Sequence, residues 1–365
     1  MREKNICYFV NCLVNGGIEA VLYNYLSRTN LENYKIIFIT TGDSNNQCIE
    51  KFEKLGASVY RIPNRRRIFK HIKCMANIIK KEKINIIHSH LGFHSFLPSL
   101  VGLICGVKIR ISHSHVFKSE KKSVKENFET FFNKIFSNFY MACGLKAGEY
   151  VFGKSKKVLI LKNSIDTSNY IFDEKIRNKK RKELKLNDKH IYANVGRFAK
   201  QKNQLFLIDV FYDISLNDSN SHLLIVGGDG NQYDLVVDKI NKLNLQNKVT
   251  LLKNRTDVNE LYQAMDILLL PSFDEGFPLV ALEAETSNLP IIFSDKITRE
   301  VEINDNVYFL PIDDYKKWSV KSVLVVNENS RSKVKNNMIE SGFNLNNSYK
   351  DLDNYYQSFL NKKYK

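Results

Sequence analysis

The chain has 365 residues, of which 43% are hydrophobic and 26% charged, which allows two globular domains and excludes an intrinsically disordered chain. The net charge of +16 is uneven: residues 1–170 carry 27 Lys and Arg against 12 Asp and Glu, whereas the other residues carry 28 against 27. The basic first half indicates an anionic partner, either nucleic acid or an anionic lipid surface. No helix-turn-helix, zinc-finger or RNA-binding motif accompanies the charge, which disfavours nucleic acid.

The cysteines and the apolar runs indicate the cellular compartment of the protein. Six cysteines occur without a Cys-x-x-Cys pair, a pattern typical of reduced thiols in a cytoplasmic protein. The longest apolar stretch, residues 91–107, is interrupted by His94 and Pro98, so it does not predict a membrane span. We therefore expect a cytoplasmic protein.

The first half of the chain alternates between short apolar runs and helical patterns. The runs predict strands at residues 5–13, 34–40, 58–62 and 85–88, with helices between them at 48–55 and 68–80. This alternation predicts a parallel, doubly wound sheet. Gly16 and Gly17 lie in the turn after the first strand, where backbone amides can approach a phosphate; a purely structural turn is the alternative.

Two polar groups stand at the ends of these elements. Arg65, Arg66 and Arg67 follow the third strand, either as a solvated loop or as a contact for lipid phosphate or a diphosphate-linked acceptor. The sequences His88-Ser89-His90 and His113-Ser114-His115 both end strands. A zinc site is conceivable there, but the absence of a nearby Cys ligand disfavours it.

Residues 126–140 predict an aromatic helix. Six apolar side chains hold helical spacing, namely Phe128, Phe131, Phe132, Ile135, Phe136 and Phe139. Lysines at 121, 122 and 125 precede them. Packing into the core of the first domain is the favoured interpretation, and a position in a membrane interface is the alternative.

A second alternation of strands and helices follows residue 190. Residues 171–189 are highly charged and lack a strand pattern, so we place a linker there. Strands are predicted at 190–196, 222–226, 250–252 and 265–270.

The segment from Pro271 to Pro290 predicts a loop and a helix after a buried strand. Glu275 lies in the loop and Glu283 in or beside the helix, at the edge where open α/β sheets bind ligands. Gly276 permits close approach of the backbone to a ligand, and amides at the helix start favour an anion. Two carboxylates in these places suit the hydroxyls of a sugar and a ribose; solvated surface charges are the alternative.

Glu275-Gly276-Phe277-Pro278, followed by Glu283, resembles the glutamate–seven residues–glutamate motif of glycosyltransferase family 4, a retaining family with the GT-B fold. The segment from Gly196 to Asn203 is similar to the phosphate-binding segment of that family. Gly16-Gly17-Ile18-Glu19 is similar to a familiar beginning of the family, so the resemblance covers nearly the whole chain. It is strongest to the bacterial capsule and exopolysaccharide branch.

The resemblance implies two Rossmann-like doubly wound domains facing across a cleft. Arg197 and Lys202 then neutralise the donor diphosphate, Glu275 contacts the transferred sugar and Glu283 the ribose. One further catalytic residue is a histidine that touches the donor sugar, and either His113 or His115 takes that place. The implied donor-binding set is Gly16, Gly17, Arg197, Lys202, Arg255, Glu275, Gly276, Phe277, Leu279, Val280 and Glu283.

We expect an N-terminal acceptor and membrane-facing domain at 1–170, the linker at 171–189, a nucleotide-sugar domain at 190–345, and a C-terminal helix at 346–365 for which packing back on the first domain is one option. The implied enzyme is a hexosyl- or N-acetylhexosaminyltransferase for capsule or exopolysaccharide. It uses a UDP-linked donor and a saccharide or polyprenyl-diphosphate-linked acceptor at the inner face of the cell membrane. No metal or other cofactor is expected, because two cations serve the diphosphate.

Three alternatives remain at this stage. A sugar phosphorylase needs phosphate and a pyridoxal cofactor, for which the sequence offers no candidate lysine motif. A catalytically silent nucleotide-sugar-binding protein would keep the same donor residues, so they do not exclude it. A nucleic-acid-binding protein would account for the basic charge alone.

Overall fold

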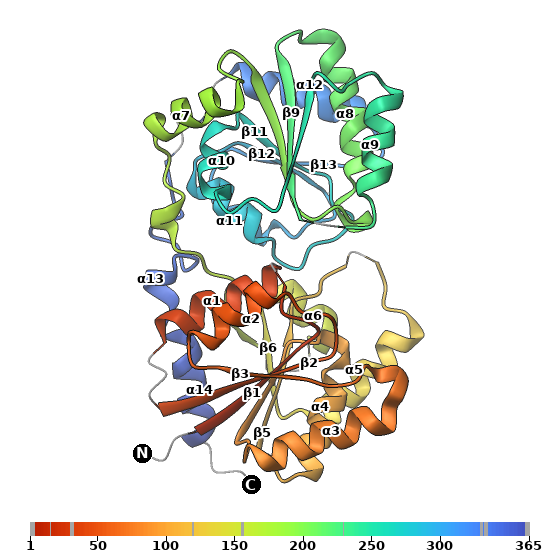
Figure 1. Ribbon diagram of the computed structural model, residues 1–365, viewed down its shortest axis with the longest axis vertical. Helices are drawn as coiled ribbons and strands as arrows, with labels where there is room; N and C mark the ends of the chain where they lie inside the picture. The colour runs from red at the N-terminus through yellow and green to blue at the C-terminus, as the bar shows by residue number, and fades with distance from the viewer. Residues whose placement is uncertain are drawn as a thin grey trace. The chain divides into compact units, whose positions relative to one another are not determined.

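The computed structural model describes residues 4–14, 16–29, 33–118, 120–154, 157–228, 230–328, 331 and 335–361. The chain forms two compact units, one made of Met1–Ser164 and Leu345–Lys365 and the other of Ile165–Asn344. Each unit contains a parallel sheet flanked by helices (Figure 1). The prediction of two doubly wound α/β domains is confirmed.

Unit 1 holds a seven-stranded parallel sheet in the order β3-β2-β1-β4-β5-β6-β7. Its strands are β1 (Lys4–Val10), β2 (Tyr34–Thr40), β3 (Ser58–Arg61), β4 (Ile86–Ser89), β5 (Ile109–Ser114), β6 (Phe139–Ala142) and β7 (Leu159–Ile160). Its helices are α1 (Gly17–Arg28), α2 (Asn46–Glu53), α3 (Ile68–Lys81), α4 (Phe96–Ile104), α5 (Val124–Phe136), α6 (Leu145–Phe152), α13 (Leu345–Ser348) and α14 (Asp351–Asn361).

The last helix, α14, belongs to unit 1 although it follows unit 2 in the sequence, and it lies among the elements of that unit (dark blue in Figure 1). Its apolar face is buried: Tyr356 is 2% exposed and Phe359 is fully buried against Phe139 of β6. The Tyr356 hydroxyl lies 2.6 Å from the hydroxyl of Tyr8 in β1. These contacts place the C-terminal helix on the sheet of unit 1.

Unit 2 holds a six-stranded parallel sheet in the order β10-β9-β8-β11-β12-β13. Its strands are β8 (His190–Val195), β9 (Ser221–Gly227), β10 (Val249–Lys253), β11 (Ile267–Leu270), β12 (Ile291–Ser294) and β13 (Val307–Leu310). Its helices are α7 (Glu174–Leu184), α8 (Gln204–Asn217), α9 (Tyr233–Lys242), α10 (Val258–Ala264), α11 (Leu279–Thr286) and α12 (Tyr315–Asn327).

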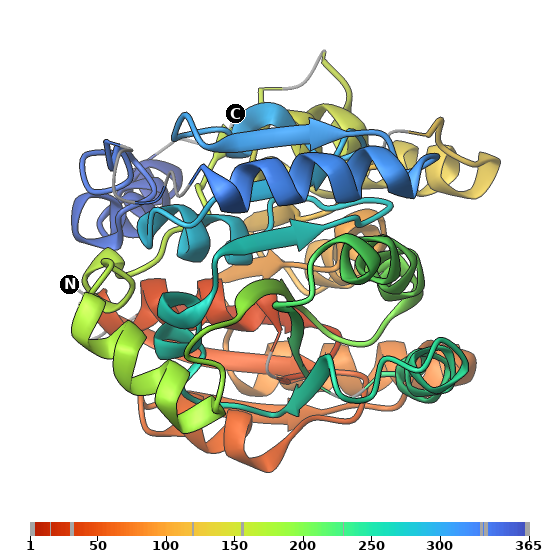
Figure 2. The same ribbon diagram turned by 90° about the horizontal axis from the view of Figure 1, so that it is seen from above.

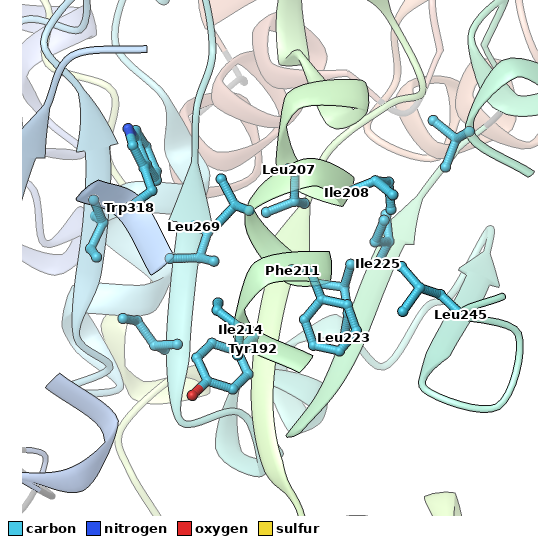
Figure 3. Close-up of a cluster of buried hydrophobic side chains, with 14 of the residues drawn as sticks. Tyr192, Leu207, Ile208, Phe211, Ile214, Leu223, Ile225, Leu245, Leu269 and Trp318 are labelled. Carbon is cyan, nitrogen blue, oxygen red and sulfur yellow. The ribbon is translucent and has the colours of Figure 1, made fainter. Parts of the chain in front are cut away.

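The core of unit 2 lies between its sheet and helix α8 (Figure 3). Tyr192 and Phe211 are fully buried there, and each such side chain contributes about 1.5–3 kcal/mol to folding. Helix α12 runs along β13 (Figure 2), where Lys321 Nζ stands 3.9 Å from the centre of the Tyr308 ring. Trp318 of α12 is fully buried and donates its indole N–H to the carbonyl oxygen of Pro311 at 2.8 Å.

The expected linker at 171–189 is wrong in one respect, because most of it is helix α7, which belongs to unit 2. Asp173 caps the helix with its side chain. Arg177 and Arg181 each lie 2.5 Å from the Asp266 carboxylate, and both donate to the carbonyl oxygen of Ala264. These bonds pair the basic side chains, so a highly charged sequence packs as part of a domain.

The favoured interpretation of the aromatic segment is wrong for Phe128, Phe131 and Ile135, which are exposed, whereas Phe139 is buried in β6. Helix α5 ends at Phe136, and its buried residues are the polar Glu129, Thr130 and Asn133. Asn133 Nδ2 donates to the carbonyl oxygen of Phe93 at 2.8 Å, and Thr130 Oγ1 donates to that of Val151 at 3.0 Å. Because these hydrogen bonds turn the polar face inward, the aromatic face points away from the core.

Candidate functional site

The strand order of unit 2 reverses between β8 and β11, which are neighbours in the sheet although β9 and β10 come between them in sequence. Open α/β sheets bind ligands beyond the carboxyl ends of the strands at such a switch point. The loops that leave these two strands are residues 196–203 and 271–278. They carry Arg197, Lys202 and Glu275, which the sequence indicated for a diphosphate and a sugar.

Polar contacts hold the two loops together. Gln201 Nε2 donates to the carbonyl oxygen of Asp274 at 2.7 Å and to its Oδ1 at 2.9 Å. The backbone N–H of Phe273 donates to the carbonyl oxygen of Gln201 at 2.9 Å. Lys202 Nζ lies 2.5 Å from Glu275 Oε1, in an ion pair whose side chains are only 16% and 12% exposed. The structure thus joins Lys202 and Glu275 directly.

Arg197 differs from Lys202 in exposure and in its partners. Its side chain is exposed, and the acidic residues of the described ranges make no ion pair with it. Its carbonyl oxygen accepts a hydrogen bond from Gln204 Nε2 at 2.9 Å, and the next residue, Phe198, is fully buried. A Cβ on Gly230 would lie 1.9 Å from the Phe198 carbonyl oxygen, so only glycine lets the loop after β9 approach this closely. The backbone at Arg197 is therefore fixed while its guanidinium is accessible to an anion.

Glu283 lies in α11, and both of its carboxylate oxygens accept hydrogen bonds from tyrosine hydroxyls. Tyr262 donates to Oε2 at 2.8 Å and Tyr170 donates to Oε1 at 3.2 Å. Burial raises the pKa of the Glu283 carboxyl, and the two hydroxyl donors act in the opposite direction. Each carboxylate oxygen has a second lone pair, so the group is oriented and can still accept from a ligand.

The start of α11 offers backbone rather than side-chain groups. Phe277 is 6% exposed and stacks on Phe343 at a centroid distance of 5.0 Å, and Leu279 is 8% exposed. Pro278 precedes the helix and supplies no side-chain cap. The first backbone N–H groups of a helix lack intrahelical acceptors. An anion bound at the N-terminal end of α11 would therefore contact backbone amides, such as those of Leu279 and Val280, next to Gly276.

Arg255, expected in the donor-binding set, is bound within the protein. Its Nε and a terminal nitrogen donate to the two oxygens of Asp257 at 2.7 and 2.6 Å, and Glu183 lies 3.3 Å away. Asp257 also pairs with Lys180 at 2.8 Å. The guanidinium fork of Arg255 therefore serves an ion-pair cluster between α7 and the loop before α10.

Two further candidates stand in unit 1, at the start of α1. Gly16 is the residue before the helix and Gly17 its first residue, while Asn15 of the same turn lies outside the described residues. A Cβ on Gly17 would meet nothing within 4 Å, so packing in this unit does not require glycine at that position.

His113 and His115 differ in how far their side chains are exposed. His113 lies in β5 and is fully buried, whereas His115 follows the strand and is partly exposed. Burial lowers the pKa of His113 well below its usual value and that of His115 to about 4. His115 Nε2 lies 2.8 Å from His90 Nδ1, and His113 Nδ1 lies 3.0 Å from His88 Nε2. Both imidazoles are therefore neutral at neutral pH, and only His115 reaches the surface of its unit.

Sequence reasoning missed the residues that orient the two glutamates. Gln201 and Asp274 lie in the segments 196–203 and 271–290 that the sequence singled out, but their contact depends on the strand order, which the sequence does not show. Tyr170 and Tyr262 carry no local signal, because their hydroxyls reach Glu283 only through the packing of α10 and the segment before α7.

Several known proteins to which this chain is similar are named as glycosyltransferases. The family model described as "Glycosyl transferases group 1" matches residues 175–345. The UDP-Gal:alpha-D-GlcNAc-diphosphoundecaprenol alpha-1,3-galactosyltransferase of Escherichia coli is 26% identical over 360 residues, covering 89% of this chain and 91% of that protein. The capsular polysaccharide biosynthesis glycosyltransferase CapH of Staphylococcus aureus is 26% identical over 309 residues, covering 79% and 80%. The family model thus matches most of unit 2.

Solved structures show the fold. Anabaena HepE, crystallised in complex with UDP and glucose, has a TM-score of 0.83 at 15% identity, covering 97% of this chain and 99% of that one. A glycosyltransferase from Rickettsia africae has a TM-score of 0.76 at 18% identity, covering all of both chains. The chain has the GT-B fold.

Proposed function

We propose that this chain, a glycosyltransferase with a group 1 domain at residues 175–345, is a retaining family 4 enzyme that transfers a hexosyl or N-acetylhexosaminyl group from a UDP-linked donor. The acceptor is a saccharide or a polyprenyl-diphosphate-linked sugar, and the product is a capsule or exopolysaccharide. The activity named for the Escherichia coli relative supports both a UDP donor and a diphosphate-linked lipid acceptor. The observation that carries the proposal is the grouping of Arg197, Lys202 and Glu275 at the switch point of unit 2.

The donor diphosphate is assigned to Arg197 and Lys202. The exposed Arg197 fork suits bidentate contact with phosphate oxygens, and Lys202 supplies a point charge. The Lys202 ammonium has three N–H donors, so its bond to Glu275 leaves two for phosphate. Negative charge grows on the departing UDP as the sugar–phosphate bond breaks, and fixed cations stabilise that charge. The proposal assigns no metal to the diphosphate.

The sugar is assigned to Glu275 and the ribose to Glu283. Lys202 holds Glu275 Oε1, which orients the carboxylate toward a hydroxyl of the sugar. Glu283, held by two tyrosine hydroxyls, accepts from the ribose. No enzymic nucleophile is assigned; the leaving phosphate takes the proton of the acceptor hydroxyl. His115 is assigned to the donor sugar in place of His113, because His113 is fully buried.

A screen of nucleotide sugars by thermal unfolding tests the donor assignment. UDP and one UDP-sugar are expected to stabilise the protein by about 2.7 kcal/mol at a hundred times their dissociation constants, while GDP- and ADP-sugars at equal concentration do less. An assay of UDP release with and without a lipid-linked acceptor then separates a transferase from a silent binding protein. The proposal fails if no uridine nucleotide stabilises the chain.

We also propose that unit 1 docks on the anionic inner face of the cell membrane. None of the helices in the described ranges is both long and apolar enough to cross a bilayer. The outward face of α5 exposes large apolar side chains, namely Val124 (88%), Phe128 (59%), Phe131 (59%) and Ile135 (52%). An amphipathic helix with aromatic residues on one face and lysines nearby suits the interface of a membrane.

The basic residues near the outward face of α5 differ in their exposure and in their partners. Lys121 and Lys125 are exposed, as are Arg66 and Arg67 at the start of α3. Lys122 instead donates to Thr130 Oγ1 and to the carbonyl oxygen of Val151, both at 3.2 Å, and burial lowers its pKa. Lys118, which precedes α5 in the chain, pairs with Glu126 at 2.9 Å. The exposed pair at 121 and 125 is therefore assigned to lipid headgroups.

Vesicle sedimentation tests this docking. The protein is expected to bind anionic but not neutral vesicles, less tightly as salt rises, because charge attraction acts over roughly 10 Å at 0.1 M salt. The double change Lys121→Gln and Lys125→Gln should weaken binding about 30-fold, since each lysine contributes about 1 kcal/mol. The matched control changes the exposed Lys316 and Lys317 of α12 to Gln and should have little effect. Indifference to anionic vesicles at low salt, or displacement from them by DNA at low concentration, would contradict the assignment.

A further inference from the structure

Two His-x-His sequences end neighbouring parallel strands of unit 1. Side chains two positions apart in a strand lie on one face of the sheet, so His88 and His90 share a face, as do His113 and His115. The register pairs His88 with Ile111, and its continuation brings His90 level with His113. The ring centroids of His90 and His113 are 4.7 Å apart. The fold thus gathers four imidazoles at the carboxyl edge of β4 and β5.

Three of these imidazoles have the spacing of metal ligands. One ring nitrogen of each of His88, His90 and His113 lies within 4.8 Å of the other two, and no other group within the described ranges meets that test. His88 Nε2 and His113 Nδ1 are 3.0 Å apart. Two nitrogen ligands with bonds of 2.0–2.1 Å to tetrahedral zinc lie about 3.3 Å apart. A small movement of the rings therefore suffices for coordination.

Two nitrogens of the group are buried without a hydrogen-bond partner. They are Nε2 of His90, whose side chain is 5% exposed, and Nε2 of His113, which is fully buried. A buried polar atom without a partner costs about 1–3 kcal/mol, a cost that an ion bound to His90 Nε2 would offset at that residue; coordination through His113 Nδ1 leaves His113 Nε2 as it is.

In two of the three histidines, the opposite ring nitrogen is held by a hydrogen bond. His88 Nδ1 lies 2.7 Å from the hydroxyl of Tyr356, which in turn meets the hydroxyl of Tyr8. His90 Nδ1 lies 2.8 Å from Nε2 of His115. Such outer hydrogen bonds select the tautomer and fix the ring so that the other nitrogen faces the ion.

We propose that His88, His90 and His113 bind one divalent transition-metal ion of the zinc type, with water in the fourth position. Neutral imidazole ligands suit zinc and its neighbours and disfavour magnesium and calcium, which prefer oxygen. The site lies in unit 1 and is independent of the donor diphosphate assigned to unit 2. Through the bond from His88 to Tyr356, the ion would link the sheet to α14.

Metal binding to the full chain tests the site without an activity assay. The protein is stripped with a chelator, dialysed against Zn²⁺ or Co²⁺, and analysed for metal content. One ion per chain is expected, with the visible absorption of four-coordinate Co²⁺. His90→Asn should abolish stoichiometric binding. The matched control is His190→Asn, which removes a partly exposed histidine of unit 2 paired with Asp218 and should bind as the unaltered protein does.

A second variant keeps the test decisive if His90→Asn does not fold. Tyr356→Phe preserves the ring in the core and removes only the outer hydrogen bond to His88, so zinc affinity should fall about tenfold. Binding well below one ion per chain in the unaltered protein overturns the proposal. So does binding that neither His90→Asn nor Tyr356→Phe weakens, because the ion would then sit elsewhere.

Discussion

Arg197→Ala should lower kcat by a factor of about 10²–10³, the loss expected when one fixed donor to the developing charge of a transition state is removed. The guanidinium is exposed and makes no ion pair with acidic residues of the described ranges, so its removal leaves no buried partner behind. The measurement is UDP release under saturating donor, with the affinity for UDP determined separately by calorimetry.

The control for this change is Lys200→Ala. Lys200 is an exposed lysine in the same loop, so the change to Ala removes one positive charge close to Arg197 in sequence. It should change kcat and UDP affinity only slightly. Unaltered turnover and UDP affinity in Arg197→Ala, or an equal loss in Lys200→Ala, would show that the diphosphate does not depend on Arg197 specifically.

Glu275→Gln and Glu283→Gln should have different effects. Glu275→Gln removes the charge that holds Lys202 and that is assigned to the sugar, so turnover should fall about 100-fold while UDP affinity stays nearly the same. Glu283→Gln should weaken UDP itself by about 10- to 100-fold, because hydrogen bonds to a charged acceptor contribute about 1.5–3 kcal/mol. Calorimetry with UDP and single-turnover kinetics with the UDP-sugar separate the two effects.

Tyr262→Phe serves as the companion to Glu283→Gln. It removes the donor to Glu283 Oε2 but keeps the carboxylate, so UDP affinity should fall less than in Glu283→Gln. The reverse pattern, with UDP affinity lost in Glu275→Gln and kept in Glu283→Gln, would exchange the roles of the two glutamates.

The sequence predicted the architecture because parallel strands leave strong local patterns. The short apolar runs of β8 and β11 are buried on both faces, and that composition suits a central position in a parallel sheet. Loops 196–203 and 271–278 were predictable as ligand loops for the same reason. Their meeting at a switch point depends on strand order, which only the structure shows.

The packing of helices α5 and α7 against the rest of the protein could not be predicted in the same way. Helical spacing in α5 identifies an apolar face, but hydrogen bonds of Asn133 and Thr130 to distant carbonyls determine that this face points outward. In α7 the charge suggested a linker, whereas Arg177 and Arg181 find acceptors around Asp266 far along the chain. Both errors arise where side-chain partners remote in sequence override a local pattern.

The return of α14 to unit 1 has a consequence for the order in which the protein forms on the ribosome. Residues 4–164 emerge first, yet Tyr8 and Phe139 lack their partners Tyr356 and Phe359 until synthesis has passed through the whole of unit 2. Unit 2 is continuous in sequence, and its sheet can close as soon as its own residues have emerged. The half of the molecule that is translated first is therefore the last to be completed, with an apolar patch open to chaperones in the meantime.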